Sequence, residues 1–138
     1  MNRLILLFIL LSLLTPLATN AQNTNDLEIF DIHKGKVIHR IPTNEEIQHE
    51  VEVYLEEISD VLHKFDPIPK SGHMIKVPLE PGITVNNEWV HTLLNEVIII
   101  LTEKEEPYLM LFDDENSVHF FTFNGEVSTL LEILDFHP

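Results

Sequence analysis

TNEEIQHEVEVYLEEISDVLHKF, residues 43–65, carries the strongest periodicity in the chain. Its large apolar residues recur every three or four positions, which is the spacing of one face of an α-helix. They are Ile47, Val51, Tyr54, Ile58, Val61 and Phe65, with Leu55 and Leu62 widening the same stripe. The sequence therefore predicts one long amphipathic helix whose apolar face packs across a sheet.

Both ends of this predicted helix carry sequence signals. Thr43 and Glu46 have the spacing of a capping box, in which the two side chains bond to backbone amides in the first turn. Asp66-Pro67 follows directly after Phe65, and a proline disfavours helical conformation in the residue before it. We expect the helix to begin after Thr43 and to end at Phe65.

The other segments predict a small antiparallel sheet and one or two short helices, which makes the fold class α+β. Gly35 sits in the turn of an N-terminal hairpin, and Pro78 favours an edge position or a strand end at 73–79. The predicted strands are the hairpin at 27–32 and 36–41, a short strand at 73–79, and a three-stranded meander at 96–103, 107–115 and 118–123.

Strand 96–103 is apolar on both faces, so the sheet needs cover on the side away from the long helix. Short helices are predicted at 87–96 and after Asn124-Gly125, where the apolar residues again have helical spacing. Either these helices cover the second face, or a second copy of the chain does so in a homodimer through the sheet.

The first 21 residues differ from the rest. Arg3 precedes an uncharged apolar run at 4–14, and small residues precede a predicted cleavage site at Ala21-Gln22. This order is typical of a secretory signal peptide. The run is shorter than the about 20 residues that cross a bilayer. The sequence predicts an exported protein with a single α+β domain over 22–138 and no stable membrane insertion after cleavage; the alternative is an uncleaved anchor.

The composition narrows the class of partner. The chain has 23 acidic and 8 basic residues, a formal net charge of −15. Such a surface repels the phosphates of nucleic acids, so the sequence argues against a nucleic-acid partner and favours a protein or cationic partner. The chain has no cysteine, which removes thiol catalysis and Cys-type zinc sites. No glycine-rich phosphate loop is present, and no cofactor is predicted.

Two groups of side chains are candidates for binding a divalent cation. The first is the outward stripe of the predicted helix, whose i, i+3 and i+7 spacing would gather ligands on one side. Its members are His49, Glu52, Glu56, Asp60 and His63. The second is the turn at 113–116, which begins with Asp113 and Asp114 but lacks the glycine and spacing of a calcium loop. A solvated acidic face and an ordinary turn are the alternatives.

No catalytic motif is present, and we name no catalytic residue. Ser71 and His73 are the one pair whose residue types suit a hydrolase, although closeness in sequence does not establish a hydrogen bond. Trp89, Lys70 and His73 are candidate partner contacts, beside the loops at 66–72 and 79–87 and a predicted edge strand at 73–77. The sequence favours an exported, non-catalytic binding domain; a secreted divalent-cation-binding protein and an uncharacterised hydrolase are the alternatives.

Overall fold

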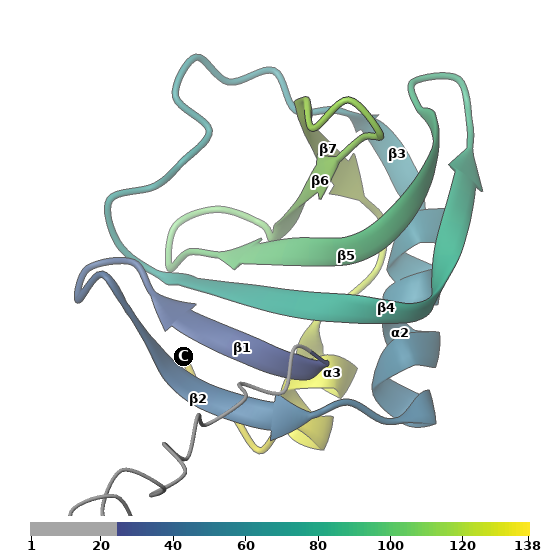
Figure 1. Ribbon diagram of the computed structural model, residues 1–138. Helices are drawn as coiled ribbons and strands as arrows, with labels where there is room; N and C mark the ends of the chain where they lie inside the picture. The colour runs from purple at the N-terminus through teal and green to yellow at the C-terminus, as the bar shows by residue number, and fades with distance from the viewer. Residues whose placement is uncertain (1–24) are drawn as a thin grey trace, which may run out of the picture.

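Seven strands form one antiparallel sheet, and two short helices lie against it (Figure 1). The computed structural model describes residues 25–138, so the predicted signal peptide at 1–21 and its cleavage site lie outside the described residues. The elements are β1 (Asp26–Asp31), β2 (Lys36–Pro42), α2 (Glu45–Glu56), β3 (Ile58–Val61), β4 (His73–Asn86), β5 (His91–Leu101), β6 (Tyr108–Phe112), β7 (Val118–Phe123) and α3 (Ser128–Ile133). The strand order is β2-β1-β4-β5-β6-β7-β3.

The predicted fold class, a small sheet crossed by one long helix, is wrong. Most of the regular structure is strand, and α2 ends at Glu56 instead of Phe65. The following residues form β3, which pairs with β7. Ile58 and Val61 still face the core because the β3–β7 register is irregular between Ile58 and Asp60. Their spacing therefore imitates a helical face. Neither helix in the described residues is long and apolar enough to cross a membrane.

The start of α2 also differs from the prediction. Asn44, not Thr43, caps the helix: its side-chain oxygen accepts a hydrogen bond of 2.9 Å from the Ile47 amide. The Thr43 hydroxyl instead donates to the Asn25 carbonyl. Asn is among the best N-cap residues, so the displaced cap has the same chemistry as the predicted one. The helix buries four side chains, namely Ile47, Val51, Tyr54 and Leu55.

The N-terminal hairpin and the C-terminal meander are confirmed. β1 pairs with β2 around Gly35, which has a φ of 65°. β5, β6 and β7 follow one another as antiparallel neighbours. The predicted short helix at 87–96 is wrong, because that segment begins β5. Its burial alternates, with Leu93 exposed and Leu94 buried, so its apolar residues follow a strand period.

The prediction of an edge position for strand 73–79 is wrong as well. β4 runs for 14 residues at the centre of the sheet, between β1 and β5. Pro78 is tolerated there because the ladder to β1 stops at Lys76, so the missing proline amide interrupts no bond to β1. The ladder to β5 is irregular between Pro78 and Ile83. β4 bends at this point toward α2 (Figure 1).

Gln48 on α2 satisfies the backbone of β4 where that ladder is irregular. Its side-chain amide donates to the Pro78 carbonyl at 2.7 Å, and its side-chain oxygen accepts from the Glu80 amide at 3.2 Å. A single side chain thus replaces two ladder bonds and ties the helix to the central strand.

The two faces of the sheet have different cover. Both helices pack against one face, where the main core includes Val51, Ile99, Phe121 and Leu130. The other face carries a second apolar cluster, whose buried residues are Ile98, Ile100, Tyr108 and Met110. The predicted helix at 87–96 does not form, and the predicted helix after Asn124-Gly125 is confirmed as α3 but packs against the main core, so neither covers the second cluster. The chain after β3 lies there instead, with Leu62 packed against the cluster and the Tyr108 hydroxyl donating to the Pro67 carbonyl.

We expect the substitution Gln48→Ala to lower the free energy of unfolding by about 1–3 kcal/mol, because it leaves a carbonyl and an amide of β4 without their partner. Chemical denaturation measures this change. Glu46→Ala removes an exposed side chain from the same helix and is the matched control. Equal stability of the two variants would show that water replaces the Gln48 bonds at no cost.

Candidate functional site

The five predicted ligands of the helix stripe do not share one element. His49, Glu52 and Glu56 are exposed on α2, whereas Asp60 belongs to β3 and His63 follows it. Asp60 and His63 remain neighbours, with 3.8 Å between Oδ1 and Nε2. Within residues 25–138 no group of three His, Asp or Glu side chains is placed to hold a metal ion. The structure therefore offers no ligand set, and the metal hypothesis stays a prediction.

The carboxylates of the 113–116 turn have internal partners. Asp113 accepts hydrogen bonds from the amides of Glu115 and Ser117 at 2.9 and 2.8 Å, and its other oxygen lies 2.8 Å from His119 Nε2. The Asp114 side chain is hydrogen-bonded to the hydroxyl of Thr92, a buried residue on β5. Asp113 therefore holds the β6–β7 turn together and joins it to β7, and Asp114 joins the turn to β5; both roles are structural.

These bonds change the acidity of both carboxyl groups. The hydrogen bond from His119 is the largest cause that lowers the pKa of Asp113 below its ordinary 3.8, and the two turn amides act in the same direction. The hydrogen bond from Thr92 lowers the pKa of Asp114. A carboxyl group with a lowered pKa in the folded state stabilises the fold above its unfolded pKa, and this contribution is lost as the pH falls through the folded pKa.

We expect Asp113→Asn to lower the melting temperature at neutral pH, with a difference from the wild-type protein that shrinks as the pH falls below 3.8. The amide cannot carry the charge that His119 and the turn amides stabilise. Thermal melts from about pH 7 to about pH 2 measure this difference. Glu115→Gln in the same turn is the control. A difference that stays constant with pH would contradict an ionic role for Asp113.

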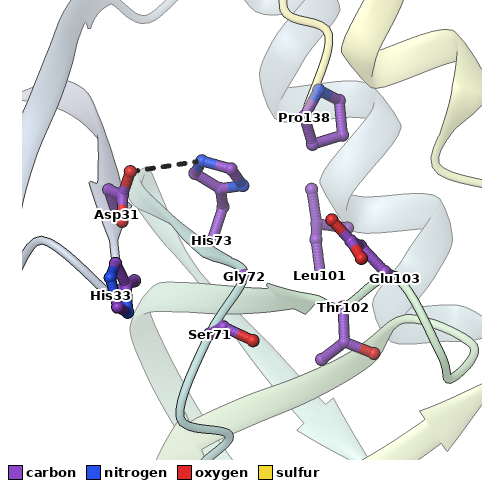
Figure 2. Close-up of a pocket in the computed structure, with 9 residues that line it drawn as sticks. All are labelled: Asp31, His33, Ser71, Gly72, His73, Leu101, Thr102, Glu103 and Pro138. Atoms are coloured by element: carbon purple, nitrogen blue, oxygen red, sulfur yellow. Dashed lines mark ion pairs between the residues drawn. The ribbon is translucent and has the colours of Figure 1, made fainter.

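Ser71 and His73 both line a cavity at one end of the sheet (Figure 2). The cavity of about 310 Å³ lies between the β1–β2 turn, the start of β4 and the end of β5; its lining residues are Asp31, His33, Ser71, Gly72, His73, Leu101, Thr102, Glu103 and Pro138. This volume is at the lower end of the range for small-molecule sites.

The cavity contains the residue types of a hydrolytic triad without its geometry. His73 Nε2 lies 3.9 Å from Asp31 Oδ2, an ion-pair distance. The Ser71 hydroxyl points away from the His73 imidazole in Figure 2. An activated serine requires its base within hydrogen-bond reach. The arrangement therefore gives the hydrolase hypothesis no support.

Asp31 has a structural role that the sequence interpretation missed. Its carboxylate accepts from the Lys34 amide at 2.9 Å and lies 3.3 Å from the Lys34 ammonium. The bond from the amide is the largest cause that lowers the pKa of Asp31. The signal for this role was an aspartate three residues before the amide it accepts from, with Gly35 next, which is a common turn pattern.

Gly72 closes the floor of the same cavity. Its carbonyl accepts from the Ile32 amide at 3.0 Å, which joins the start of β4 to the β1–β2 turn. Its φ is 112°, and a Cβ atom there would lie 2.2 Å from the Leu101 carbonyl oxygen. The close approach of the two backbones therefore requires glycine.

We expect Gly72→Ala to lower the free energy of unfolding by about 1–3 kcal/mol from backbone strain alone, with the contact to Leu101 adding to it. Gly35→Ala is the matched control, because Gly35 also has a positive φ but has nothing within 4 Å of its added Cβ. We expect Gly35→Ala to lower the free energy of unfolding by about 1 kcal/mol. Denaturant unfolding compares the two, and a smaller loss at Gly72 would contradict the packing argument.

The segment between β3 and β4, residues 62–72, presents apolar side chains to solvent; we call it the β3–β4 loop. Phe65 is fully exposed, and Ile68 is 41% exposed. The loop is anchored on either side of Phe65. Lys64 forms an ion pair of 2.6 Å with Glu105 and lies over the Tyr108 ring, and the Pro67 carbonyl accepts from the Tyr108 hydroxyl.

The remaining predicted contact residues lie at separate places. Lys70 is exposed on the β3–β4 loop, and His73 is half-buried at the start of β4, where its ring meets the edge of Phe136. Trp89 lies in the β4–β5 turn, half-buried against the main core. The Asn87 side chain holds this turn by accepting from the amides of Trp89 and Val90.

Comparison with protein-family models, with curated proteins and with solved structures finds no match for this chain. Among the described residues, four large apolar side chains are exposed, and two of them, Phe65 and Ile68, lie together on the anchored β3–β4 loop; the other two, Leu93 and Val118, lie on separate strands. Sequence reasoning missed Phe65 because the residue completes the apparent helical stripe; the Asp66-Pro67 pair directly after it was the available signal of a loop.

Proposed function

We propose that this protein is an exported, acidic, non-catalytic domain that acts by binding another protein, with the β3–β4 loop as its contact surface. Exposed Phe65 is the observation that carries the proposal. A free phenylalanine ring in water is unfavourable, and large aromatic side chains at the centre of an interface supply much of its binding energy.

The anchoring of the loop supports a binding role. Because Lys64 and Pro67 are tied to Glu105 and Tyr108, the residues between them lose little further freedom when a partner binds. A pre-ordered loop reduces the entropy cost of association. Asp66 and Pro67 next to Phe65 also restrict the backbone around the ring.

The net negative charge of the chain favours a partner whose contact surface is basic. With 23 acidic and 8 basic residues, the protein repels acidic surfaces and attracts basic ones at long range. The partner that fits best offers an apolar pocket for Phe65 and Ile68 within a basic surface. Export is proposed on the signal-peptide pattern of residues 1–21.

Capture experiments with the immobilised protein test this proposal. We expect the wild-type protein to retain a partner from extracytoplasmic extract and Phe65→Ser to bind that partner at least about tenfold more weakly, since loss of a central aromatic costs about 2 kcal/mol or more. Calorimetry with the purified partner measures the change. Leu93→Ser removes another exposed apolar side chain, on β5, and is the control. Equal affinity of Phe65→Ser and wild-type protein would exclude the loop as the contact surface.

A further inference from the structure

The strand order ends with β2 on one side and with β3 on the other, and residues 83–86 of β4 line a pocket together with Ile58 of β3. Among residues 25–138, β2 pairs only with β1, and β3 pairs only with β7. An unpaired edge carries a row of backbone donors and acceptors that can bind another strand.

The two edges are similar in length. β2 has seven residues. The β3 strand has four, but its ladder to β7 extends at both ends, because the Glu57 carbonyl accepts from the Asn124 amide and the Leu62 amide donates to the Phe120 carbonyl. Residues 57–62 are therefore held in the sheet as an edge of nearly the same length as β2.

The two edges have opposite charge. β2, KVIHRIP, contains two basic residues and no acidic one. Lys36 is exposed, and Arg40 keeps 47% of its side chain exposed while its Nε donates to Glu28. Residues 56–62, EEISDVL, contain three acidic residues and no basic one. Glu56, Glu57 and Asp60 are all exposed.

Arg40 and Asp60 also lie on the same side of the sheet. Arg40 is opposite Glu28, whose neighbours Leu27 and Ile29 are the residues of β1 that face the core. Asp60 is opposite Thr122, the neighbour of buried Phe121. Because side chains alternate along a strand, Arg40 and Asp60 both lie on the face away from the helices.

The strand directions permit the edges to meet. Six successive antiparallel pairings separate β2 from β3, so the two strands run in the same direction. Stacking one copy beside the next would place β3 parallel to β2. In that direction, the register that sets Arg40 beside Asp60 also brings Lys36 to the end of β3 where Glu56 and Glu57 lie.

We infer that copies of this protein associate head to tail, with the acidic β3 edge of one copy adding to the basic β2 edge of the next. The contact is heterologous, so it forms a ring or an open chain of domains. The association depends on sheet pairing for its geometry and on charge for its selectivity: two β2 edges, or two β3 edges, set like charges together.

Light scattering after size-exclusion chromatography tests the association. We expect the mass to rise above that of one chain as the protein concentration increases from about 1 µM to about 1 mM. The mass should fall back when salt is raised from about 0.05 M to about 1 M, because salt screens exposed charges. A protein that stays monomeric across the whole range at low salt would overturn the inference.

Charge reversal identifies the edges. We expect Arg40→Glu and Asp60→Lys each to weaken self-association about tenfold or more, and an equimolar mixture of the two variants to recover it, because each supplies the edge that the other repels. Lys36→Glu provides a second β2 variant at an exposed side chain. Circular dichroism verifies that each variant is folded.

Two controls separate this contact from others. Lys104→Glu and Glu115→Lys make the same changes of net charge in exposed loops away from both edges, and they should leave the mass unchanged. Phe65→Ser should do the same, because the β3–β4 loop is a different surface. A loss of association with Arg40→Glu but not with Asp60→Lys would indicate pairing of β2 with β2 and would overturn the head-to-tail arrangement.

Discussion

The long antiparallel ladder between β4 and β5 is the constraint on which the rest of the structure depends. It runs from His73 opposite Leu101 to Asn86 opposite His91, and it is interrupted only between Pro78 and Ile83. Ile75, Val77, Val97 and Ile99 are fully buried along it. Because both strands are longer than the others, they reach from the end cavity to the helix α2. β1 and β2 are added on the side of β4, and β6, β7 and β3 on the side of β5.

The interruption in that ladder determines where α2 lies. A strand that bends leaves backbone groups without ladder partners, and each such group is costly when buried. Gln48 supplies both a donor and an acceptor to this place, so the helix is fixed by polar contacts as well as by burial of Val51 and Tyr54. The helix is short and covers only the bend of β4 and part of the main core. The loop after β3 covers part of the other face of the sheet.

Local turn chemistry made part of the fold predictable. Gly35 identified the first hairpin, and short polar links identified the C-terminal meander, because such signals depend only on neighbouring residues. The wrong helix predictions arose where pairing with a strand distant in sequence determines the local structure. An irregular register lets Ile58 and Val61 both face the core, and adjacent Leu93 and Leu94 match a helix and a strand equally well over a short window. Likewise, Ser71 and His73 do lie in one cavity, but no sequence rule gives the direction of the serine side chain.

The end of α2 at Glu56 therefore determines both the last strand of the sheet and the exposure of Phe65. A helix continued to Phe65 would leave the edge of β7 unpaired and remove Leu62 from the second apolar cluster. Ending the helix early lets residues 57–62 complete the sheet and places Phe65 outside it. The same six residues carry acids on an open edge, while the basic residues of β2 lie on the opposite edge. Two of the few basic residues of the chain therefore lie on the edge at which we propose that a second copy binds, and its most exposed aromatic ring lies on the loop proposed to contact a different protein.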